Sequence, residues 1–221
     1  RPTTAATVFV NDVIGDEVTW GSRPNIDEAL SSGEIVRNTE PENVGGVLIK
    51  EETIPVFFEG QVIAVISRHR NAEQMRSPGR LELNYREIAN HLYQMVAEGN
   101  FPYQDAGSLF EPVPRVGDGL IRLDVNGAIS FASPNAKSAF SRMGWRGDLE
   151  GRNLGEAAAQ VVTASPNAQE EAIRSRLNGK VLRRVEIDNQ GATIDLLVLP
   201  LIQGSDRIGA IVLLQNVTEL R

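Results

Sequence analysis

The chain has 221 residues, 41% of them hydrophobic and 23% charged, which accommodates two folded globular domains rather than a disordered tail. Its formal net charge of -7 argues against a nucleic-acid partner, because Lys and Arg supply most of that affinity. The absence of Cys excludes disulfides and thiolate metal sites and favours the cytoplasm, and the apolar runs are too short to span a membrane.

The N-terminal part of the chain combines a strand pattern with a short helix pattern. Residues 6–14 are rich in β-branched side chains and predict a strand. Residues 25–32 predict a helix that stops at Gly33. Because the chain begins with Arg1 rather than Met, we expect a fragment from which an upstream segment has been removed.

Two apolar, β-rich runs follow, over residues 44–58 and 61–67. They meet at Glu59-Gly60, which predicts a hairpin. Pro55 lacks a backbone donor and therefore indicates an edge strand or a bulge. This part of the chain predicts an antiparallel sheet.

Residues 81–98 have the spacing of an amphipathic helix that ends before Gly99. Its apolar stripe consists of Leu81, Tyr85, Ile88, Leu92 and Met95. We expect this stripe to pack on the sheet of its own domain, with a dimer seam as the alternative. Residues 100–117 hold three prolines and two glycines without periodicity, so we place a domain linker there.

The second half opens with two short strands, at residues 120–123 and 129–132. Between them, Asn126-Gly127 favours positive φ angles and predicts a two-residue hairpin turn. We expect Ser133 to cap, and Pro134 to begin, a helix that runs to residue 143.

Two further helices and three strands complete the pattern. The helices are expected at residues 154–163 and 168–177, and the strands at 181–187, 192–201 and 207–217. Turn residues separate these strands, which predicts an antiparallel meander. The chain as a whole predicts an α+β fold of two domains, each an antiparallel sheet with helices packed on it.

Several stretches resemble known sensor domains. The sequence GDGLIRLDVNGAISFASPNAKSAFSRMG (117–144) resembles the opening of a PAS domain, and RIGAIVLLQNVTELR (207–221) resembles its final strand and exit signature. EALSSGEIV (28–36), IPVFFEGQVIAVISRHR (54–70) and the helix at 81–98 resemble the GAF-type domain of actinobacterial cytosolic sensor histidine kinases. The resemblance implies a GAF-like domain over 1–99, a linker over 100–117 and a PAS domain over 118–221.

This resemblance implies the signal-sensing region of a two-component sensor histidine kinase. The implied partners are the protein's own C-terminal kinase core and, through that core, a response regulator. ATP and Mg²⁺ are expected for the kinase core alone, and no catalysis is expected within these residues. A small-molecule signal and a homodimer both fit the resemblance. The alternative is a GAF-PAS input module for a cyclase, a phosphatase or an RNA-binding regulator.

The resemblance to a PAS domain also implies where a ligand would bind. In PAS domains a ligand lies on the concave side of the sheet, and the residues expected there are Phe131, Phe140, Trp145, Leu154, Leu177, Leu196, Val198, Val212 and Leu214. We favour a filled core or a small-molecule pocket, since the second half has no Cys for a flavin adduct and no His to ligate haem. No cofactor is predicted here.

The expected signal exit consists of Asn216, Val217 and Thr218. Asn216 stands where PAS exit signatures usually have Asp, which replaces a charge-assisted contact by a neutral hydrogen bond. We expect a signal to pass through the strand at 207–217 into a following helix rather than through the linker.

No catalytic or metal-binding constellation emerges from the sequence. His69 and His91 are the only histidines, and we interpret both as structural or surface residues rather than phosphoacceptors or metal ligands. Glu51 and Glu52 are adjacent, so their side chains point to opposite sides of a strand. We interpret both carboxylates as solvent-exposed.

Overall fold

The computed structural model describes residues 15–72, 77–101, 117–161, 183–189 and 192–216. Its contacts divide the chain into two compact units, the first comprising Arg1–Gly79 and Val96–Gly99 and the second Arg80–Met95 and Asn100–Arg221. Within the described ranges, no helix is both long and apolar enough to cross a membrane.

Three predicted features fall outside these ranges. They are the strand at 6–14, the helix at 168–177 and most of the linker at 100–117. The domain boundaries placed on either side of that linker stay predictions. Elsewhere the two units have antiparallel sheets with helices packed on them, which confirms the predicted α+β fold class.

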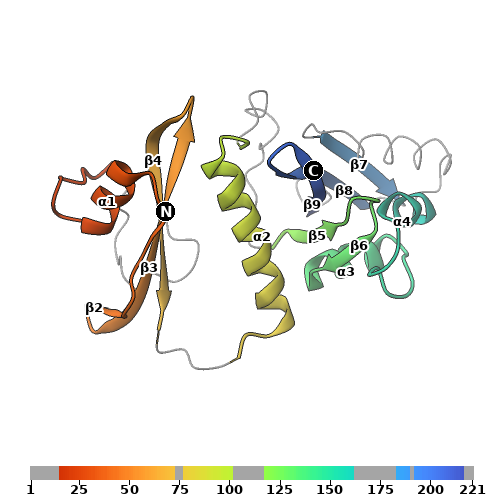
Figure 1. Ribbon diagram of the computed structural model, residues 1–221. Helices are drawn as coiled ribbons and strands as arrows, with labels where there is room; N and C mark the ends of the chain where they lie inside the picture. The colour runs from red at the N-terminus through yellow and green to blue at the C-terminus, as the bar shows by residue number, and fades with distance from the viewer. Residues whose placement is uncertain (1–14, 73–76, 102–116, 162–182, 190–191, 217–221) are drawn as a thin grey trace. The chain divides into compact units, whose positions relative to one another are not determined.

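The first unit is a small sheet with one described helix against it (Figure 1). Its elements are helix α1 (Pro24–Ser32) and strands β1 (Val36–Arg37), β2 (Glu42–Val44), β3 (Val47–Phe58) and β4 (Gln61–Asn71). β3 is central, and β1, β2 and β4 all pair antiparallel with it. The predicted helix is confirmed, and it ends at Gly33, whose φ of 70° is left-handed.

β3 and β4 form the hairpin that the sequence predicts. Its turn consists of Glu59 and Gly60, with φ values of 49° and 78°. Positive φ at both central residues matches the twist of the flanking strands. Pro55 pairs with Val65 in the central strand, so the edge-strand alternative is wrong. The pairing register shifts one residue further on, between Val56 and Phe57, where Ile63 of β4 is the extra residue of a bulge.

The second unit is a larger sheet with helices on both of its faces. Residues 80–95 of helix α2 (Arg80–Ala97) belong to it, and the other elements are β5 (Gly119–Leu123), β6 (Ile129–Ala132), α3 (Pro134–Arg142), α4 (Leu154–Val161), β7 (Arg183–Asn189), β8 (Ala192–Gln203) and β9 (Asp206–Asn216). The strand order is β6-β5-β9-β8-β7. Neighbouring strands are antiparallel, and β7, β8 and β9 form the predicted meander.

Helix α3 begins as the sequence predicts. The Ser133 hydroxyl accepts a hydrogen bond from the Ala136 N–H at 3.3 Å, and Pro134 occupies the first turn. The same hydroxyl accepts from the Leu120 N–H at 2.9 Å, which ties the helix start to β5. Beside it, a Cβ on Gly119 would lie 2.8 Å from Ala136 Cα, so only glycine allows this close approach.

The turn between β5 and β6 differs from the prediction. Gly127 has a φ of 82°, but Asn126 does not have a positive φ. The Gly127 N–H donates to the Asp124 carbonyl at 3.2 Å, so Val125 and Asn126 are the central residues of the turn. Glycine follows this turn in the left-handed conformation, which is the geometry of a longer hairpin loop.

The two faces of this second sheet bury different side chains. The face covered by α3 and α4, the inner face, carries Ile121, Leu123, Ile187, Leu196, Val198, Val212 and Leu214. The opposite, outer face carries Leu120, Leu197, Leu199, Leu201 and Ile211, and α2 packs against it. Alternation along each strand produces these two sets, because successive side chains point to opposite sides.

Candidate functional site

The inner face of the second sheet holds most of the predicted pocket. Phe140 from α3 and Leu154 from α4 meet the strand residues Leu196, Val198 and Leu214, each 3% exposed or less. Val212 lies in the same cluster, and Trp145 packs against it. These residues therefore come together as expected, and their role in ligand binding stays a prediction. Leu177 lies outside the described residues.

Phe131 does not belong to this inner cluster, so its predicted position is wrong. It lies on the outer face, with Arg122 as its partner on β5. Leu123 pairs with Ile129, so Ser130 is an extra residue that makes a β-bulge. The bulge reverses the alternation, and the Phe131 side chain points away from the inner face.

Trp145 contributes a polar group to the edge of the inner cluster. Its indole Nε1–H is buried and has no hydrogen-bond partner among the described residues. A buried donor without an acceptor costs free energy, which an acceptor atom of a bound molecule would recover. Trp145 follows α3, where its backbone N–H donates to the Phe140 carbonyl at 2.9 Å. Trp145 thus places a buried donor beside the residues that were expected to line a pocket.

The predicted signal exit, residues 216–218, begins at the end of β9. Asn216 is the last residue of β9, and it pairs with Ile194 of β8. Just before it, Gln215 is 7% exposed and donates to Asp118 Oδ2 at 3.0 Å. Val217 and Thr218 lie outside the described residues. The role of these residues as an exit stays a prediction.

Helix α2 covers the outer face with the stripe that the sequence identifies. Ile88 and Met95 are 5% and 0% exposed in the outer-face cluster, and Leu92 packs against it. The Tyr85 ring contacts Phe131 edge to face, with centroids 6.1 Å apart. The stripe therefore packs on the sheet of the second unit, whereas the sequence led us to expect the sheet of the first.

A polar contact joins the same helix to β5. Arg122 Nη1 lies 2.8 Å from Glu87 Oε2, and Arg122 Nη2 lies 3.4 Å from His91 Nε2. Glu87 and His91 are one turn apart on α2. His91 is thus a half-buried residue of a helix–sheet contact.

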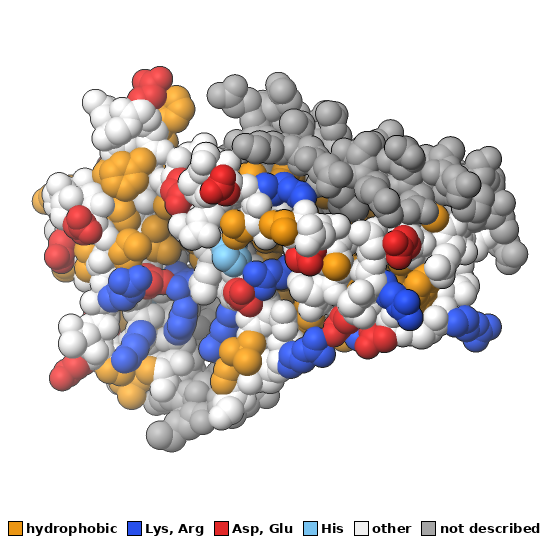
Figure 2. Space-filling view, turned by 45° about the vertical axis from the view of Figure 1, so that its right-hand side comes forward, with side chains coloured by type: hydrophobic (Ala, Val, Ile, Leu, Met, Phe, Trp, Pro, Cys, Tyr) orange, Lys and Arg blue, Asp and Glu red, His pale blue; other side chains and the backbone are white. Residues whose placement is uncertain are grey.

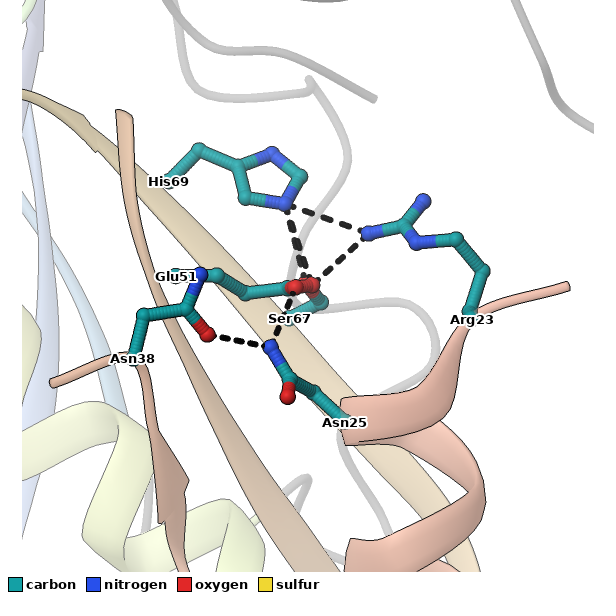
Figure 3. A network of polar contacts seen from close by, with 6 residues as sticks. All are labelled: Arg23, Asn25, Asn38, Glu51, Ser67 and His69. Atoms are coloured by element: carbon teal, nitrogen blue, oxygen red, sulfur yellow. Dashed lines mark hydrogen bonds and ion pairs between the residues drawn. The ribbon is translucent and has the colours of Figure 1, made fainter. Parts of the chain in front are cut away.

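In the first unit, a buried carboxylate gathers side chains from both sheet and helix (Figure 3). Glu51 on β3 is 7% exposed. Its carboxylate accepts from Arg23 Nη2 at 2.7 Å and from Asn25 Nδ2 at 2.9 Å, both at the start of α1. From β4 it contacts the Ser67 hydroxyl and His69 Nε2, the latter at 3.1 Å. The network fastens the first turn of α1 to the sheet.

These hydrogen bonds determine the ionisation of Glu51. Burial alone would raise the pKa of its carboxyl, but the hydrogen bonds outweigh burial and lower the pKa from 4.5 to about 2. The donors, in order of effect, are Ser67, Asn25, His69 and Arg23. Glu51 is therefore a buried carboxylate anion at neutral pH.

The sequence-based interpretation of Glu51 as solvent-exposed is wrong. Its neighbour Glu52 points to the other side of β3, as predicted, where it pairs with Arg37 at 2.7 Å and with Arg68. The signal for Glu51 lies in its strand: Ile49, Glu51 and Thr53 alternate on one side and are all buried. Recognising it requires knowing which side α1 covers.

These polar residues do not assemble a metal centre. Among the described residues, no group of three or more His, Asp or Glu side chains is placed to hold a metal ion. Figure 2 shows one face of the molecule, where acidic and basic side chains are interspersed with hydrophobic ones. Such interspersion keeps that face from presenting a field of a single sign.

Comparison with known proteins places these features in a family. A family model described as the GAF domain of the histidine kinase PdtaS matches residues 1–89. Sensor histidine kinase PdtaS of Mycolicibacterium smegmatis is 38% identical over 226 aligned positions, covering 100% of this chain and 45% of that protein. The Mycobacterium tuberculosis protein of the same name is 38% identical, with 100% and 46% covered.

A solved structure extends the similarity to three dimensions. It is described as the sensor region of a sensor histidine kinase and is 35% identical, with a TM-score of 0.78. The match covers 100% of this chain and 78% of that one. By contrast, the chain spans about half the length of the curated relatives that it matches.

Proposed function

Since this chain belongs to the sensor regions of PdtaS-type sensor histidine kinases, we propose that its parent protein is a histidine kinase that it regulates. The observation that carries the proposal is the similarity over 100% of the chain, at 35% identity, to a region described as a sensor. A kinase core of the parent binds ATP and Mg²⁺, phosphorylates its own histidine and passes the phosphoryl group to a response regulator.

The proposed input is a small molecule or a partner that binds one arrangement of the domains better than another. Such a ligand shifts the population toward that arrangement by its difference in affinity. The inner face of the second sheet is the proposed binding place, with the Trp145 N–H as the polar group that orients a ligand. A cytoplasmic location and a homodimer complete the proposal, and the Cys-free composition fits a reducing compartment.

The proposed output leaves through β9. Its residues Val212 and Leu214 belong to the inner cluster, while Asn216 ends the strand. A change in packing on the inner face thus reaches residues 216–218 within a few positions. Short polar side chains at such a junction can bond either to the sheet or to a following helix.

Autophosphorylation of the parent protein tests the proposal. We expect deletion of these 221 residues from the parent protein to change the rate of phosphate incorporation from ATP. Thr218→Ala should change this rate without altering the melting temperature. An output that is insensitive to deletion of the chain would contradict the proposed function. The chain alone should incorporate no phosphate on His69 or His91.

Loss of output on lengthening the linker at 100–117, together with a silent Thr218→Ala, would contradict the proposed exit. In that case the signal would pass through the linker instead. A matched control is Ser138→Ala, which removes an exposed hydroxyl from α3, a helix far from β9 in the sequence. We expect this control to leave the output unchanged.

A further inference from the structure

The outer face of the second sheet is an apolar surface that needs a cover. Leu197, Leu199 and Leu201 on β8 and Ile211 on β9 are each 5% exposed or less. α2 contributes to this cover, because its Ile88 and Met95 lie in the same cluster. A sheet face of this kind would form a large exposed apolar patch without a helix on it.

The cover is held unevenly along the helix. Ile88 and Met95, near the middle and the end of α2, are its buried hydrophobic residues. In the first two turns, Leu81 and Tyr85 remain 43% and 42% exposed although they belong to the same stripe. From Ile88 onward α2 is therefore packed on the sheet, whereas the stripe residues of its first two turns stay partly exposed.

Charged side chains connect this first part of α2 to other residues of the second unit. Arg122 on β5 is 21% exposed and pairs with Glu87, which is 55% exposed, at 2.8 Å. Arg80 at the start of α2 reaches Glu150 at 2.5 Å. One partner of each pair is exposed to solvent, and such ion pairs contribute little free energy each and break readily. They favour one orientation of the helix but still allow that orientation to change.

The position of α2 in the chain gives this contact a consequence. α2 follows β4 of the first unit after residues 72–79, and residues 98–118 separate it from β5. A short stretch of chain therefore joins the first unit to α2. Ile211 of β9, the strand that ends at Asn216, lies in the same outer-face cluster as Ile88 and Met95 of α2.

We propose that the outer face of the second sheet is the surface through which the first unit acts on the second, with α2 as the moving element and the Glu87–Arg122 pair as its latch. The proposal rests on the proposed function and specifies its regulation. It assigns different faces of one sheet to the two inputs: the inner face to a ligand of the second unit, the outer face to the first unit.

Charge reversal tests the latch in the 221-residue chain. Arg122→Glu places like charges together, and we expect the backbone amides of α2 to exchange hydrogen about twofold to fivefold faster. The exchanged pair, Glu87→Arg with Arg122→Glu, should restore most of the protection. Arg86→Glu is the matched control, because it changes the same charge on an exposed helix pair with Glu82.

A second pair of variants tests the packed half of the helix. Ile88→Ala should raise exchange in α2 by more than tenfold, whereas Leu83→Ala, which truncates a half-exposed residue on the other side of the helix, should not. If neither Arg122→Glu nor Ile88→Ala altered exchange in α2, the helix would not be a movable cover and the proposal would be wrong.

Autophosphorylation of the parent protein then separates the two levels of inference. We expect Arg122→Glu to change the output, the exchanged pair to restore it and Arg86→Glu to leave it unchanged. Faster exchange in α2 with an unchanged but sensor-dependent output would overturn the role of α2 alone. An output indifferent to deletion of the whole chain would overturn the proposed function as well.

Discussion

His69 Nε2 lies 3.1 Å from Glu51 Oε1, directly across the pairing of β3 with β4. This contact belongs to a network that joins both strands to the first turn of α1, and His69 is one of the two histidines of the chain. Because the carboxylate is buried, the donors around it replace the water that it loses. We therefore expect the stability of the first unit to depend on Glu51.

Glu51→Ala should lower the free energy of unfolding of the first unit by about 2–3 kcal/mol. The substitution leaves buried donors without their acceptor and detaches the start of α1. Urea unfolding followed by circular dichroism measures the change. Glu42→Ala on β2 removes an exposed carboxylate and should cost less than about 0.5 kcal/mol. Equal effects of the two substitutions would contradict the structural role of Glu51.

Acid should weaken the first unit through the same residue. The pKa of Glu51 in the folded protein, about 2, lies below its ordinary value of 4.5. Its contribution to stability is therefore fully present above about pH 4.5 and is lost as the pH falls toward 2. With about 1.4 kcal/mol for each pKa unit, the expected loss is about 3 kcal/mol. Unfolding of Glu51→Gln should show a flatter pH profile in this window; parallel profiles would be evidence against it.

Gly119→Val should destabilise the second unit by about 2 kcal/mol or more. The new Cβ would lie 2.8 Å from Ala136 Cα and 2.9 Å from Ala136 N, so backbone must move to admit it. Gly117→Val is the control, since no atom lies within 4 Å of a Cβ at that position. Thermal unfolding compares the two variants, and similar melting temperatures would show that β5 and α3 are not this closely packed.

Gly127→Val should lower stability by about 1 kcal/mol or more, because valine is strained at a φ of 82°. Asn126→Ala should change stability by less than about 0.5 kcal/mol, since Asn126 has no positive φ. Differential scanning calorimetry distinguishes the two variants. A large effect of Asn126→Ala with a small effect of Gly127→Val would favour a different turn geometry.

Trp145→Phe should leave stability unchanged within about 1 kcal/mol, because the indole Nε1–H that it removes has no partner. If that N–H orients a ligand, the same substitution should weaken binding of an acceptor-bearing ligand by about tenfold. A ligand screen by thermal shift, followed by calorimetry on both proteins, measures this. Equal affinity of both proteins for every ligand found would remove Trp145 from the site.

The sequence by itself determined the features that depend on a few neighbouring residues. Ser133 and Pro134 specify the start of α3, because a hydroxyl cap and a missing N–H both suit a first helical turn. Glu59-Gly60 specifies the hairpin turn, and Gly33 the end of α1. The resemblance to PAS domains placed Leu196, Val198, Val212 and Leu214 on one face of the second sheet, and these four do share its inner face.

Only the tertiary structure decided which residues meet across the sheets. An unbroken hairpin counted back from the Phe58–Gln61 pair would place Arg68 opposite Glu51, but the bulge in β3 and β4 shifts the pairing by one residue and brings His69 there. The bulge at Ser130 moves Phe131 to the outer face in the same way. Side chains alternate with a period of two, so one extra residue exchanges the two faces of a strand. Whether a strand accommodates that residue depends on the packing of the whole sheet, which no short stretch of sequence contains.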